Sequence, residues 1–114
     1  QRKILVEVLR AQHQHLDLSA KQSQNLDLLL SENTFTVTTG HQLNLFSGPV
    51  FFVYKILQTI KTADFLTQNS DKNFVPIFWL ATEDHDFEEI NHFKRQMDFI
   101  KSKEILVVQL AELL

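Results

Sequence analysis

The 114 residues predict an α/β fold built around one strand–helix–strand unit, on the basis of three observations. Residues 35–39 are β-branched or aromatic and end at a glycine. Residues 49–67 form an apolar stretch of helical length that begins at a proline, and residues 74–81 form an unbroken apolar run of strand length. The helix between the two strands is long enough to let them pair in parallel.

Composition narrows the functional classes before any motif is considered. The chain holds 11 Lys and Arg against 14 Asp and Glu, and this net charge of −3 argues against a nucleic-acid partner. It has no cysteine, which excludes disulfides, thiolate nucleophiles and Cys-ligated zinc within these residues. No apolar run reaches membrane-spanning length, and the first residues lack the layout of a signal peptide. We therefore expect a cytoplasmic protein without a membrane partner.

The N-terminal residues 2–31 are predicted to form one long helix. They contain no Gly or Pro, are rich in Leu, Gln and Lys, and carry an imperfect apolar stripe at helical spacing. His13 and His15 lie two positions apart and so do not share a helix face. We interpret both imidazoles as solvated or locally hydrogen-bonded, and the helix as a structural element that packs against the rest of the domain.

The loop predicted over 40–48 concentrates the residues that break regular structure. Three of the four Gly and Pro residues of the chain, Gly40, Gly48 and Pro49, lie within ten positions. Pro49 suits the first position of a helix, whose free N–H groups and dipole favour an anion. The loop is thus a candidate anion site, and its alternative is a structural loop whose polar groups cap the helix. The polar side chains concerned are His41, Gln42 and Asn44.

A charged segment follows the second predicted strand directly. The strand is continuously apolar, which is typical of a parallel strand covered on both faces, and residues 83–86 then read Glu-Asp-His-Asp. Carboxylates beside an imidazole suit general acid–base chemistry, whereas the alternative is a solvated acidic start of a helix over 87–93. A third interpretation places a metal ion on His85, Glu89 and His92, which share one helix face.

Topology predicts that the loop and the charged segment meet. A right-handed crossover brings both strand ends to one edge of the sheet, where ligands of open α/β sheets bind. Lys55 lies on the connecting helix, and its ammonium either extends to solvent or reaches an anionic substrate group. Phe78 and Trp79 are expected in the core. In the C-terminal part, 95–104 is typical of a helix, and 105–108 fits either a strand or a longer helix.

Two long stretches resemble the BshC family, the cysteine-adding enzymes of bacillithiol biosynthesis. The first is TTGHQLNLFSGP at 38–49 with YKI at 54–56, and the second is VPIFWLATEDHDF at 75–87 with EINH at 89–92. The resemblance implies a Rossmann-like core, of which 35–93 is the first βαβ portion behind the helical segment 1–34. It also implies a much longer parent with a helical coiled-coil domain that makes a homodimer. Residues 94–114 are left unassigned, as a piece from a later part of the parent.

The resemblance implies a ligase that joins the carboxyl of cysteine to the amine of glucosaminyl malate, with this fragment alone inactive. A nucleotide such as ATP is compatible, although no cofactor is identified from the residues. The alternatives are a sugar- or nucleotide-binding module without chemistry, and a metal-dependent hydrolase. The catalytic candidates are His41, Asp84, His85 and Asp86; the substrate- or nucleotide-binding candidates are Thr39, Gly40, Gln42, Asn44, Gly48, Lys55, Glu83, Asn91 and His92; no metal ligand is assigned.

Overall fold

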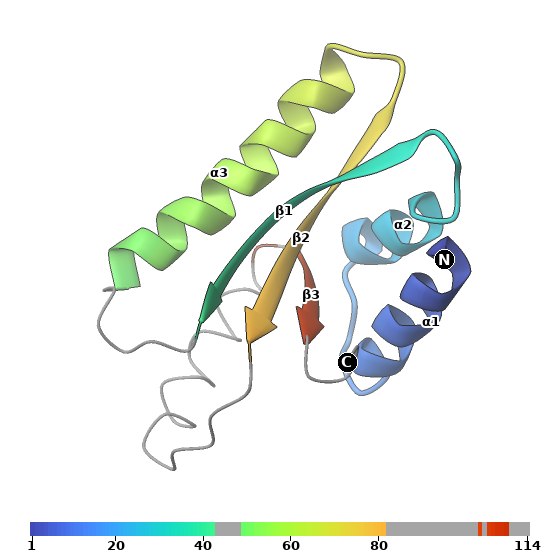
Figure 1. Cartoon of the computed structure of the whole chain (residues 1–114), viewed down its shortest axis with the longest axis horizontal. Helices are drawn as coiled ribbons and strands as arrows, with labels where there is room; N and C mark the ends of the chain where they lie inside the picture. The colour runs from blue at the N-terminus through green and yellow to red at the C-terminus, as the bar shows by residue number, and fades with distance from the viewer. Residues whose placement is uncertain (43–48, 82–102, 104, 110–114) are drawn as a thin grey trace.

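The computed structural model describes residues 1–42, 49–81, 103 and 105–109, and it has the predicted α/β architecture (Figure 1). Three parallel strands form one sheet in the order β1-β2-β3. The elements in chain order are α1 (Arg2–His13), α2 (Ala20–Leu28), β1 (Thr34–Gln42), α3 (Pro49–Gln68), β2 (Asn73–Ala81) and β3 (Leu106–Gln109). The strand–helix–strand unit is confirmed, and the helix predicted over 49–67 differs from α3 by one residue.

All three strands end at the same edge of the sheet. β1 and β2 pair over their whole length, so that Gln42 lies opposite Ala81. β2 and β3 pair with Leu80 opposite Gln109. The right-handed crossover rule predicted this common edge for the first two strands, and β3 extends it.

The sheet lies between two helical layers, with α3 on one face and α1 and α2 on the other (Figure 1). Successive strand residues point to opposite faces, so β2 serves both layers. Phe78 is fully buried, as are Ile56 and Ala63 of α3. The cluster on the other face consists of Val6 and Leu9 of α1, Leu26 and Leu29 near α2, Val75 and Ile77 of β2, and Leu106 of β3.

The single helix predicted over 2–31 is wrong, because residues 14–19 separate two helices. Ser19 starts α2 with a capping box: its Oγ accepts a hydrogen bond from the Gln22 backbone N–H at 3.1 Å. In return, the Gln22 Oε1 accepts one from the Ser19 N–H at 3.0 Å. The pair satisfies two N–H groups that a helix start leaves open, so it stabilises a new helix at this point.

Two further boundaries differ from the sequence prediction. β1 extends to Gln42, so Gly40 and His41 belong to the strand rather than to the loop. Residues 105–108, for which the sequence fitted either a strand or a longer helix, lie largely in β3. The helices predicted over 87–93 and 95–104 lie outside the described residues.

Gln22 also joins α2 to the sheet, and this contact gives a stability prediction. Its Nε2 donates to the Ile105 carbonyl at 3.2 Å in a buried position. Gln22→Glu keeps an acceptor for Ser19 but sets a carboxylate oxygen against that carbonyl, and we expect a loss of about 2–3 kcal/mol in the free energy of unfolding. Denaturant unfolding of the full-length protein measures it. The exposed Gln24→Glu on the same helix is the matched control, and an equal loss in both variants would contradict the assigned contact.

Candidate functional site

The candidate site is the edge at which β1 and β2 end side by side. Gly40 lies opposite Trp79, His41 opposite Leu80, and Gln42 opposite Ala81. The residues that follow Gln42 and those that follow Ala81 in the sequence therefore start from neighbouring positions. The structure thus places the last residues of β1 and β2 next to each other, and each of the two sequence motifs continues from one of these strand ends. The site candidates Asn44, Gly48, Glu83, Asp84, His85, Asp86, Asn91 and His92 lie outside the described residues.

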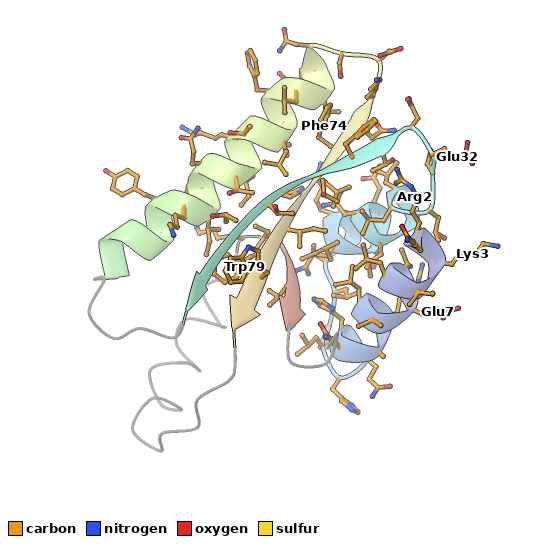
Figure 2. All side chains as sticks on the ribbon, viewed as in Figure 1. Arg2, Lys3, Glu7, Glu32, Phe74 and Trp79 are labelled. Carbon is orange, nitrogen blue, oxygen red and sulfur yellow. The ribbon has the colours of Figure 1, made fainter. Side chains whose placement is uncertain are left out.

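Gly40 leaves room for the indole of Trp79, which lies across β1 (Figure 2). A Cβ atom on residue 40 would overlap Cδ2 and Cε2 of that ring. The packing of Trp79 therefore requires glycine here, independently of any ligand. Trp79 is the residue that the sequence analysis missed as part of the site. The available signal was a glycine within a strand, which often marks a close approach by another group.

Lys55 reaches the same glycine from α3. Its Nζ donates to the Gly40 carbonyl oxygen at 3.3 Å in a partly buried position. The next turn of the helix is held by Thr59, whose Oγ1 donates to the Lys55 carbonyl at 2.8 Å. The structure thus places the positive charge of Lys55 near the strand ends. The sequence alone did not decide whether this ammonium extends to solvent or to a substrate group.

The start of α3 adds a second source of positive potential at this edge. The helix begins at Pro49 and runs for 20 residues back along the sheet (Figure 1). Its N-terminal N–H groups and dipole favour an anion at that end. With the Lys55 ammonium, the arrangement can hold a phosphate or a carboxylate group next to the ends of β1 and β2.

The remaining candidates are placed as follows. Thr39 is half-buried on β1 next to Gly40 and lies opposite Phe78 in the register. His13 and His15 lie on the other side of the sheet, near β3, and do not join this edge. In the part of the chain that the structure describes, no three His, Asp or Glu side chains gather into a metal site. Within the same residues, no helix is long and apolar enough to cross a membrane.

The family model and the relatives that match this chain all belong to the same protein family. Residues 1–111 match the family model described as Bacillithiol biosynthesis BshC, N-terminal Rossmann-like domain. Relatives carrying the name "Putative cysteine ligase BshC" include one from Flavobacterium johnsoniae, 57% identical over 90 residues, which cover 78% of this chain and 17% of the relative. The relative from Christiangramia forsetii is 56% identical over 93 residues, covering 81% and 17%.

A relative of lower sequence identity carries the same name. The protein of that name from Staphylococcus saprophyticus is 40% identical over 88 residues, which cover 77% of this chain and 16% of the relative. The chain therefore spans about a sixth of the length of the curated relatives it matches. The site described above lies within this N-terminal part.

Proposed function

Because the chain belongs to the BshC family and carries its N-terminal Rossmann-like domain, we propose that the full-length protein is a ligase of bacillithiol biosynthesis. The proposed reaction joins the carboxyl of cysteine to the amine of glucosaminyl malate. The family match over residues 1–111 is the observation that carries the proposal. The positively charged edge at Gly40 and Lys55 supports it, since both substrates carry carboxylates.

The chemistry of this reaction needs an activated carboxyl group and a deprotonated amine. A nucleotide such as ATP supplies the activation when bound, and Lys55 with the start of α3 would hold an anionic group of nucleotide or malate. The amine nitrogen attacks the activated carboxyl carbon and the C–N bond forms. The bond between that carbon and the activating group breaks, and the activating group leaves with the electron pair. One of Asp84, His85 and Asp86 takes the proton that the amine loses.

The test is product formation by the full-length protein with cysteine, glucosaminyl malate and ATP, followed by mass spectrometry. We expect bacillithiol, a product whose mass equals the two substrates less one water. A binding module would instead show no turnover but would be stabilised by ligand, by about 2.7 kcal/mol at a hundred times Kd. Ligand stabilisation without any turnover would replace the ligase proposal. A metal-dependent hydrolase is disposed of if the protein, purified without chelator, contains no stoichiometric metal.

Lys55→Met should weaken substrate binding more than catalysis. The variant keeps the apolar stem of the side chain and removes the ammonium from the strand ends. We expect KM for the anionic substrate it contacts to rise by about 10- to 100-fold, with kcat changed by less than about threefold. Steady-state kinetics with each substrate varied in turn measures both constants. Lys61→Met, on the exposed side of α3, is the control, and an unchanged KM for every substrate would remove Lys55 from the binding site.

We also propose that the full-length protein is a cytoplasmic homodimer, held by a helical coiled-coil domain outside this chain. The support is the resemblance of the two motifs to the BshC family, together with the greater length of the relatives. Light scattering of the full-length protein should give twice the mass of its chain. A monomeric mass at micromolar concentration would contradict the dimer.

A further inference from the structure

A cavity of about 200 Å³ lies between the end of α1, the linker 14–19 and the β3 side of the sheet. Figure 1 shows this linker passing beside β3, on the opposite side of the sheet from α3. Its walls are mainly apolar and are formed by Leu16, Leu18, Ile105 and Val107. Lys55 and Gly40 do not line it, so it is a different place from the candidate site at the strand ends.

His13 is the buried titratable group of this cavity. The residue is only 5% exposed, and its Nδ1 lies 2.7 Å from the Leu9 carbonyl oxygen. Because a carbonyl oxygen only accepts, Nδ1 carries the hydrogen of this bond. In the neutral ring Nε2 then has a lone pair, and no partner for it exists among the residues that the structure describes. This lone pair can accept a hydrogen bond from a donor group of a ligand in the cavity.

The other buried polar side chain of the cavity is already engaged. Gln22 accepts from the Ser19 N–H through Oε1 and donates to the Ile105 carbonyl through Nε2. An apolar cavity of about 150 Å³ can bind benzene, so the volume here suits a ring system slightly larger than benzene. Asp17 and His15 lie exposed at the rim.

We propose that this cavity is a binding site for a small, flat, mostly apolar molecule with one N–H or O–H group that donates to Nε2 of His13. The inference is independent of the ligase activity. It assigns a role to a buried histidine that the strand-end site does not use. The apolar walls provide affinity through surface burial, and the imidazole provides selectivity for the donor.

The test uses indole and benzofuran as probes on the full-length protein. The two have nearly the same shape, but benzofuran has a ring oxygen in place of the N–H donor. Calorimetric titration should give indole a Kd about fivefold lower than that of benzofuran. In protein labelled with ¹⁵N-histidine, the Nε2 resonance of His13 should move with indole and stay unchanged with benzofuran.

Two variants separate binding from folding. His13→Leu should bind both probes with the same Kd, and its circular dichroism spectrum shows whether it is folded. Leu16→Trp, which fills the cavity from the half-exposed linker, should abolish binding of both probes. Glu7→Gln, exposed on α1, is the control and should bind as the unchanged protein does. Equal affinity for the two probes, or no binding of indole at 5 mM by the folded unchanged protein, would overturn the proposal whatever the ligation assay shows.

Discussion

Asp84→Asn in the full-length protein is expected to lower kcat for ligation by about 10²- to 10⁴-fold, the range attributed to one acid–base group. Asp84 follows β2 by three residues, and β2 ends beside β1 at the positively charged edge. In the proposed mechanism its carboxylate takes the proton of the attacking amine, or orients the imidazole of His85 that does so. The amide of asparagine keeps the size of the side chain and removes both roles.

The same variant should leave folding and substrate binding intact. Steady-state kinetics, thermal unfolding and calorimetric binding of glucosaminyl malate measure the three properties separately. Asp64→Asn, an exposed carboxylate of α3, is the matched control and should have normal kcat. His41→Ala is expected to abolish ligation in the same way. An unchanged kcat for Asp84→Asn would remove this residue from the mechanism.

Gly40→Ala is expected to cost about 3 kcal/mol in the free energy of unfolding and to lower ligation more than tenfold. The added Cβ would take the place of the Trp79 indole, so the ring must move or β1 must shift away from β2. Either change displaces the Gly40 carbonyl from Lys55 and disturbs the aligned strand ends. Denaturant unfolding and the ligation assay measure both effects. Thr38→Ala, exposed on the same strand, is the control.

A double variant tests the cause of the Gly40 effect. Trp79→Leu removes the ring atoms that the new Cβ would meet, so Gly40→Ala should cost much less in that background. Contacting residues deviate from additivity, and we expect a coupling of about 2 kcal/mol. If Gly40→Ala costs the same in both backgrounds, packing against the indole is not the reason for the glycine.

The strand–helix–strand unit could be predicted from the sequence because each of its elements is marked by neighbouring residues of a distinctive type. Pro49 marks the start of α3, and the unbroken apolar run marks β2. The break in the N-terminal helix was missed because helix-forming residues continue through 14–19. The spacing of Ser19 and Gln22 held the signal for a new helix start. β3 was left open because four consecutive apolar residues fit a strand and a buried helix equally.

For the site, topology was predictable and the contacts were not. The shared edge of β1 and β2 follows from the handedness of the crossover. The contacts of Gly40 with Trp79 and Lys55 depend on the register between strands and on the rotation of α3, which one sequence does not specify. Tyr54 shows the same limit: it lies in an apolar stretch of the sequence, yet it is 68% exposed because α3 turns Ile56 and Ala63 toward the sheet.

The central claim is that substrate binds where β1 and β2 end side by side. A crystal structure of the full-length protein with glucosaminyl malate tests it most directly. We expect the malate carboxylates within hydrogen-bonding distance of Lys55 Nζ or of the N–H groups at the start of α3, close to Gln42 and Ala81. Substrate bound elsewhere, with this edge at a distance from every substrate atom, would contradict the claim.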